Sequence, residues 1–159
     1  MILDERAEFA DAVSVAATAS TFVVGDVMDL GSAPTTQDIG IGEPMWIVIN
    51  VDTEIITGGN AGTIQFHVVS DSLATLGSAT VASCTTHLTS DSIVTDGTDA
   101  NGALCKAGAT IIASRLPSGS YERYLGVLCT VGTTTTTAGK VNAFLTKDLG
   151  KWTALPDAL

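Results

Sequence analysis

The feature that most constrains this chain is a strict alternation of side chains between two faces. In MWIVINVDTEI, residues 45–55, one set of alternate positions is almost wholly apolar and the other turns polar toward its end. The first set is Ile47, Ile49, Val51, Thr53 and Ile55, and the second is Trp46, Val48, Asn50, Asp52 and Glu54. TIQFHVV, residues 63–69, repeats the pattern with Ile64, Phe66 and Val68 on one face. Successive side chains of a strand point to opposite faces, so both runs predict β-strands.

The connection between these two runs is rich in residues that tolerate turn conformations. It reads TGGNAG, residues 57–62, and its glycines and asparagine accept the positive φ that tight hairpin connections demand. We therefore expect the two strands to form a hairpin.

A second pair of patterned runs flanks five consecutive threonines, residues 133–137. Alternate residues from Leu125 to Val131 are apolar in the first run, and so are those from Val141 to Leu145 in the second. Threonine is β-branched and favours extended backbone, whereas a mucin-like stalk would be rich in proline and serine. We expect the threonines at the tip of a hairpin or in its fraying strand ends, not in a linker.

Further short strands are predicted along the rest of the chain, separated by glycine- and proline-rich turns. They cover residues 12–17, 22–30 (broken by Gly25), 79–86, a short piece near Ile93, and 109–116. This pattern predicts an all-β, jelly-roll-like β-sandwich of about eight short antiparallel strands. We expect a single domain over residues 1–159, with an N-terminal arm at 1–11 and a C-terminal tail at 148–159. Residues 2–9 fit one or two helical turns as well as an arm.

The charge of the chain narrows the classes of partner. Seven Lys and Arg against 17 Asp and Glu give a formal charge of -10, and binding to phosphates needs clustered basic residues. We therefore expect no nucleic-acid partner and no membrane partner; no apolar run is long enough to span a bilayer. The acidic start MILDE does not resemble a secretory signal, so we expect a protein made without export. The odd, widely spaced cysteines Cys84, Cys105 and Cys129 fit buried thiols in a reducing cytosol.

Residues suited to catalysis are few. The only histidines are His67, on the polar face of its strand, and His87, and both fit solvated or structural roles better than a ligand or a base. No nucleophile elbow, paired metal histidines or Cys-x-x-Cys unit occurs. The acidic segment 91–101 fails the calcium-loop pattern of an EF-hand at two ligands, which leaves a divalent site from Asp91, Asp96 and Asp99 as an alternative to a solvated loop. We expect no enzyme activity, no cofactor and no bound metal.

Four stretches carry a resemblance to a known family. They are MILD at the start, DIGIGEPMWIVINVD at 38–52, RLPSGSYERYLGVLCTVG at 115–132 and AGKVNAFLTKD at 138–148. In order and spacing they resemble the Bbp16-type capsid cement, or decoration, proteins of tailed bacteriophages, whereas residues 77–108 depart from the pattern. The resemblance implies a jelly-roll protein that oligomerises, binds the outer surface of the capsid and bridges neighbouring major capsid subunits against internal DNA pressure.

The partners that this resemblance implies are the major capsid protein and further copies of the chain, as a homo-oligomer such as a dimer or trimer. The implied location is the capsid exterior of a virion assembled in the host bacterial cytoplasm. Candidate partner contacts are the apolar residues of both chain ends and two charged residues, namely Ile2, Leu3, Glu122, Arg123, Trp152 and Leu155. For the chain ends the alternative is that they pack on their own sandwich, and for Glu122 and Arg123 that they are ordinary exposed charges. The alternative functions are a jelly-roll carbohydrate-binding module and, last, a cupin-like metalloenzyme.

Overall fold

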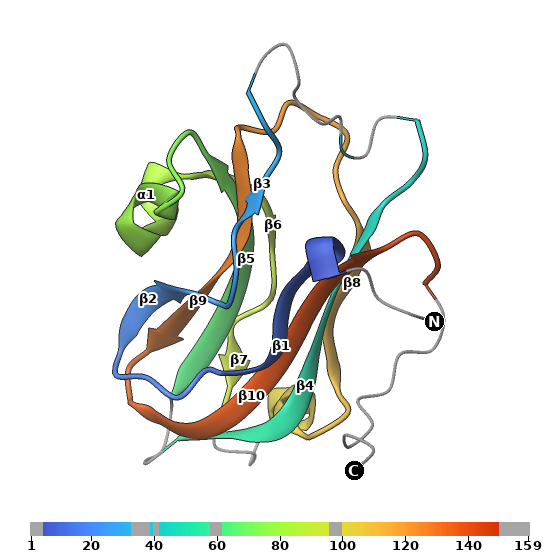
Figure 1. Ribbon diagram of the computed structural model, residues 1–159. Helices are drawn as coiled ribbons and strands as arrows, with labels where there is room; N and C mark the ends of the chain where they lie inside the picture. Colours follow the sequence, from blue (N-terminus) through green and yellow to red (C-terminus); the bar gives the residue numbers. More distant parts are fainter. Residues whose placement is uncertain (1–4, 33–38, 40–41, 58–61, 96–99, 150–159) are drawn as a thin grey trace.

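Two antiparallel β-sheets pack against each other in the computed structural model (Figure 1). The structure describes residues 5–32, 39, 42–57, 62–95 and 100–149. In sheet order, the four-stranded sheet contains β1 (Glu8–Ser14), β10 (Thr136–Thr146), β4 (Trp46–Thr57) and β8 (Thr110–Arg115). The six-stranded sheet contains β2 (Ser20–Val23), β9 (Tyr124–Gly132), β5 (Thr63–Asp71) and β6 (Thr85–Thr89), with β3 (Met28–Asp29) beside β9 and β7 (Ile93–Val94) beside β5.

Helical segments are short. They are the 3-10 turns Glu5–Ala7, Val81–Ser83 and Ala100–Cys105 and the element α1 (Leu76–Ala79). In α1, Leu76, Gly77, Ser78 and Ala79 all have φ between 46° and 60°, so it is one left-handed turn. Within the described ranges no helix has the length and apolar character needed to cross a bilayer.

The strand order is that of a jelly roll. Setting aside the two-residue strands β3 and β7, the strands pair as β1 with β10, β2 with β9, β4 with β8, and β5 with β6. The first four strands of the chain are thus matched in reverse order with the last four, as in one long hairpin rolled up into two sheets. The predicted all-β sandwich is confirmed.

Both predicted local hairpins are wrong. β4 lies in the four-stranded sheet and β5 in the six-stranded sheet, and β9 and β10 are divided in the same way. The connections after β4 and β9 therefore pass from one sheet to the other. The threonine run forms such a crossing: Thr133 has a positive φ of 66°, and β10 begins at Thr136. Turn composition identified the bends but could not say which strand pairs with which.

Several predicted boundaries also need correction. The expected N-terminal arm ends early, because residues 8–11 belong to β1, which starts four residues before the predicted strand at 12–17. The strand predicted at 79–86 is instead α1, a 3-10 turn and the start of β6. The strand at 22–30 is divided into the end of β2 and β3 around Gly25, whose φ is +67°. The C-terminal tail is described only at Asp148 and Leu149.

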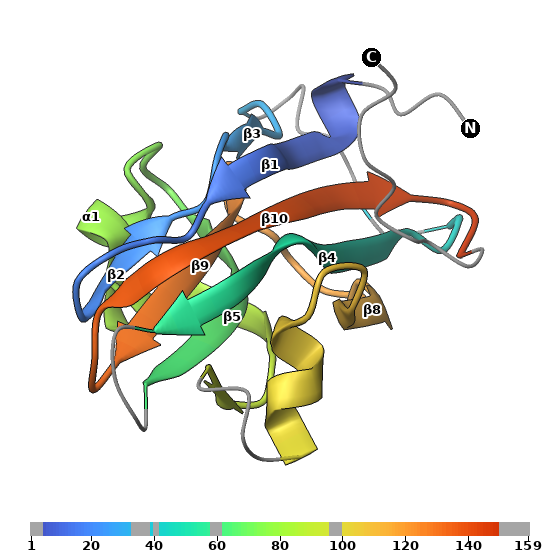
Figure 2. The ribbon, with the colours of Figure 1, turned by 90° about the horizontal axis from the view of Figure 1, so that it is seen from below.

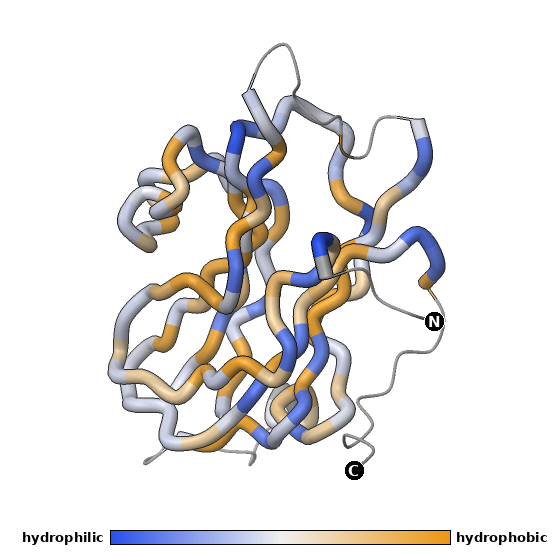
Figure 3. Tube along the Cα trace, in the orientation of Figure 1, coloured by the Kyte–Doolittle hydropathy of each residue, from blue (hydrophilic) through white to orange (hydrophobic). Residues whose placement is uncertain are grey.

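One hydrophobic cluster draws its side chains from both sheets. Ile47, Ile49 and Val51 of β4 are fully buried in it, together with Phe66 and Val68 of β5, as their alternation predicts. Figure 3 shows apolar and polar positions alternating along the strands. Thr53 departs from the pattern and is exposed, because register shifts in the pairing of β10 with β4 fall next to it. Cys105 and Cys129 are buried, as expected, and form no disulfide, whereas Cys84 is half-buried.

Candidate interaction surface

Of the six candidate contact residues, the structure describes two. Ile2, Leu3, Trp152 and Leu155 lie outside the described residues, so their proposed contacts stay predictions. Glu122 and Arg123 are the two residues directly before β9, at one end of the six-stranded sheet.

Both of these charged residues are bound within the chain. The Thr85 hydroxyl donates to Glu122 Oε1 at 2.7 Å, and the Glu122 backbone N–H donates to Ser70 Oγ at 3.1 Å. The Arg123 guanidinium donates to both carboxylate oxygens of Asp29, at 2.9 and 2.8 Å. These bonds, with a further one from the Gly31 N–H, lower the pKa of Asp29 to about 2. The two side chains tie β3 and β6 to the segment entering β9, so a partner would have to compete with these bonds.

The bond between Ser70 and His87 has the length found between a nucleophile and its base. Ser70 Oγ lies 2.8 Å from His87 Nε2, and the His87 ring packs on Tyr121 with centroids 4.1 Å apart. Ser70, however, has no exposed surface, so its hydroxyl is out of reach of a substrate. Burial lowers the pKa of His87, while the nearby Glu122 charge acts in the opposite direction. The arrangement fits the structural role predicted for this histidine.

His67 also has structural partners. It is 7% exposed, and its ring lies 3.2 Å from the hydroxyls of both Thr89 and Thr130 on the neighbouring strands. Burial lowers the pKa of His67. Among the described residues no group of three or more His, Cys, Asp or Glu side chains is placed to hold a metal. Of the acidic segment, Asp91 is described, whereas Asp96 and Asp99 lie outside the described residues.

The sandwich has two lateral sides that differ, which we call the closed side and the open side. On the closed side lie the edge strands β1 and β2, which follow each other in the chain (Figure 2). Here the Asp26 N–H donates to the Phe9 carbonyl at 2.7 Å, a direct backbone bond between the segment after β2 and β1. Gly25 lies so close that a Cβ on it would sit 1.9 Å from the same carbonyl oxygen. The backbones of the two layers are therefore in direct contact on this side.

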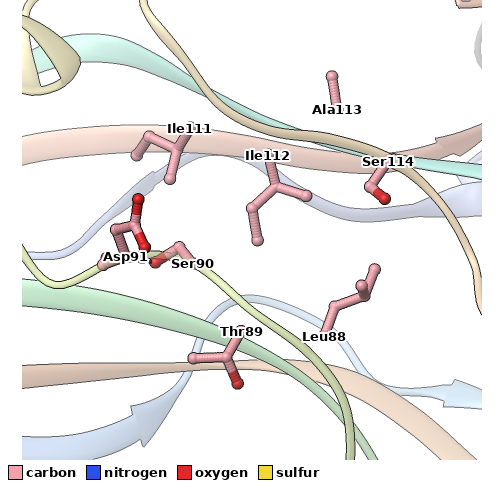
Figure 4. A pocket seen from close by; sticks show the side chains of 8 residues that line it. All are labelled: Leu88, Thr89, Ser90, Asp91, Ile111, Ile112, Ala113 and Ser114. Carbon is pink, nitrogen blue, oxygen red and sulfur yellow. Dashed lines mark hydrogen bonds between the residues drawn. The ribbon is translucent and has the colours of Figure 1, made fainter.

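On the open side lie the other two edge strands, β6 and β8. A cavity of about 300 Å³ separates them, lined by Leu88, Thr89, Ser90, Asp91, Ile111, Ile112, Ala113 and Ser114. Figure 4 shows Leu88 and Ile112 pointing into the gap from opposite strands, with the Asp91 carboxylate directed toward Ile111. No backbone hydrogen bond joins β6 to β8 in the described residues. On the open side the two layers are therefore separated by a cavity, with no backbone hydrogen bond between the edge strands that the structure describes.

Reasoning from the sequence did not find this side. Its strands were predicted in part, at 109–116 and 79–86, but which strands lie at the edges depends on the order of pairing. The available signal is composition: neither β6 nor β8 contains a proline, and β8 has no charged residue before Arg115, so two common protections of a strand edge are missing from β8.

Comparison with known proteins identifies a family. No curated protein matches the chain. The family model described as Bbp16 matches residues 9–145, a range that runs from β1 to β10 and includes the stretch 77–108. Because the match covers far more than half of the chain, this protein belongs to the Bbp16 family.

Proposed function

We propose that the protein is a capsid cement protein of a tailed bacteriophage. It binds the outer surface of the shell and bridges neighbouring major capsid subunits, so that the shell resists internal DNA pressure. It acts as a homo-oligomer, is assembled in the host bacterial cytoplasm, and has a binding role in place of a catalytic one. The observation that carries the proposal is the family match over residues 9–145, since Bbp16-type proteins, which the four quoted stretches resemble, have this role.

The architecture supports a mechanical role. The core is continuous between the sheets, and the charged residues at the end of the six-stranded sheet are bound internally. A rigid body of this kind loses little conformational freedom on docking, which favours binding. An oligomer that engages two shell subunits at once gains avidity of roughly 10² to 10⁴ over a single site.

The carbohydrate-binding alternative finds no support in the described surface. Sugar sites commonly use exposed aromatic rings, as do other sites that stack flat apolar faces. Every aromatic residue in the described part of the chain, including Trp46, Tyr121 and Tyr124, is buried or half-buried.

The proposal is tested with purified protein and phage shells that lack it. We expect saturable binding at a fixed ratio to the major capsid protein, and a higher temperature of shell disruption once the sites are filled. Bovine serum albumin at the same concentration is the control for unspecific protection. Shells that bind none of the protein, or whose disruption temperature stays unchanged at full occupancy, would refute the proposal.

A further inference from the structure

The outer face of the four-stranded sheet, which is turned away from the core, is buried along its centre. Ile47 points into the shared core, so its neighbour Val48 on β4 points the opposite way. Val48 is nonetheless fully buried, and Phe144, its partner on β10, is 3% exposed. Asn50 and Thr146 share this face and are buried as well. We call these four outward-pointing residues the outer strip.

The six-stranded sheet shows what burial of an outer face requires. Val69 of β5 also points away from the shared core and is fully buried. Leu76 of α1 covers it, and the two pack with Leu128 in a second hydrophobic cluster. Figure 1 shows α1 on the outside of this sheet. An outward valine in the middle of a sheet therefore loses its exposure when a further segment of the chain lies over it.

The described helices and strands provide no such cover for Val48. Besides the neighbouring strands β10 and β8, β4 contacts chiefly the 3-10 turn Ala100–Cys105. Cys105 belongs to the shared core, so this turn approaches β4 from the inner side of the sheet. On the outer side, Ala113 of β8 lies beside Val48 and is exposed. The cover is therefore narrow and follows β4 and β10.

The chain leaves β10 on this same face. The side chain of Thr146, the last residue of β10, points outward with that of Phe144. Its hydroxyl donates to the Asp148 carbonyl at 3.0 Å and accepts from the Asp148 N–H at 3.2 Å, so the backbone bends over the outer face directly after the strand (Figure 1). Lys147 forms an ion pair with Glu43, just before β4. The pair holds this bend beside the start of β4.

We propose that the C-terminal segment 150–159 crosses the outer strip, with the apolar side chains of Trp152 and Leu155 packed on it. An extended segment of this length spans up to roughly 33 Å. Val48 lies only about 7 Å along β4 from Trp46, the first residue of that strand. A tryptophan side chain buries roughly 150–250 Å², which is enough to cover a valine and part of its neighbour.

The C-terminal segment fits this place better than other parts of the chain. Of the other segments outside the described residues, only 1–4 contains more than one large apolar side chain. It precedes β1, which is separated from β4 by β10. If the C-terminal segment covers the strip, Trp152 and Leu155 are not available as contacts to another protein. The inference does not depend on the proposed function.

The first test is a double-mutant cycle in the full-length protein, measured by urea unfolding. We expect Trp152→Ala to lower the urea midpoint, and to lower it by roughly half as much or less when Val48→Ala is already present, because the two side chains share one contact. Val69→Ala is the matched control, since it shortens a fully buried outward valine that lies under α1. With Val69→Ala, Trp152→Ala should keep its full effect. Additive effects at Val48 would overturn the proposal, and so would coupling of Val48→Ala to Leu3→Ala instead.

Fluorescence gives a second reading, which does not depend on stability. Trp46→Phe leaves Trp152 as the only tryptophan. We expect its emission at a shorter wavelength than in the urea-unfolded chain, and slower quenching by acrylamide, because the ring is shielded from water. Emission and quenching equal to those of the unfolded chain would overturn the docking, whether or not the valine variants fold. A signal that reaches the unfolded value on dilution would show docking onto a second copy and would also overturn the proposal.

Discussion

The closed side and the open side of the sandwich show two ways to end a pair of sheets. On the closed side the chain itself runs from β1 into β2, and a backbone bond between Asp26 and Phe9 joins the segments of the two layers. On the open side β6 and β8 are separated in the chain by β7 and the 3-10 turn Ala100–Cys105, and they leave a cavity between them. The comparison shows that the two sheets are held together by the chain and its backbone on one side, and only by the packing of side chains around a cavity on the other.

The largest expected loss of stability comes from removing a core side chain on the closed side. Phe9 is 1% exposed and belongs to the shared core, so Phe9→Ala should lower the free energy of unfolding by about 3–5 kcal/mol. Leu88→Ala on the open side removes a half-buried side chain that already borders a cavity, and should cost only about 1 kcal/mol. Urea unfolding measures both. Equal losses would mean that the two sides do not differ in packing.

The backbone contact of the closed side is tested by Gly25→Ala. The new Cβ would lie 1.9 Å from the Phe9 carbonyl oxygen, in a residue with φ of +67°, and both conditions oppose the substitution. We expect a loss of about 2 kcal/mol or more in urea unfolding. Gly119→Ala is the matched control, because nothing lies within 4 Å of its Cβ position and its φ is not in the left-handed region. A Gly25 variant as stable as this control would contradict the close approach of Gly25 to the Phe9 carbonyl.

Acid should weaken the strands that hold the two histidines. Burial lowers the pKa of His67 and of His87 from the ordinary 6.5, so the unfolded chain takes up protons more readily than the folded chain. Stability through these groups is complete above about pH 7 and falls as the pH drops below about 6.5. The urea midpoint should follow this course, and the hydrogen-exchange protection factors, corrected for the intrinsic rate at each pH, should fall in β6 before they fall in β1. His67→Gln and His87→Gln variants should reduce the slope, and an unchanged slope in both would contradict the assignment.

The smallest effect concerns the ion pair that holds β3 to the start of β9, next to the closed side. Arg123→Gln should raise the pKa of Asp29 from about 2 toward its ordinary 3.8, as followed by NMR titration. Because the folded pKa is the lower one, the stabilisation is present above 3.8 and is lost as the pH falls through about 2. Lys140→Gln is the control and should leave the Asp29 titration alone. A normal Asp29 titration in the wild type would argue against the pair in solution.

The sequence predicted strands best where burial alternates along the chain. Ile47, Ile49 and Val51 lie in the core because one face of β4 is packed and a shift of one residue would expose them. Alternation failed at residues 79–83 of the strand predicted at 79–86, which form the end of α1 and a 3-10 turn. The left-handed turn of α1 places the buried Leu76 against Gly126. Periodicity has no means of indicating such a turn.

The amino-acid sequence by itself determined an acidic, all-β chain with a two-sheet core, because these properties depend on composition and on side-chain alternation within single strands. Only the tertiary structure decided that β4 and β5 lie in different sheets, that Glu122 and Arg123 are bound internally, and that β6 and β8 flank an open side. The physical reason is that strand pairing in a rolled hairpin joins distant segments. Their hydrogen bonds are made by the backbone, which is the same in every residue but proline, so local sequence cannot specify the partner.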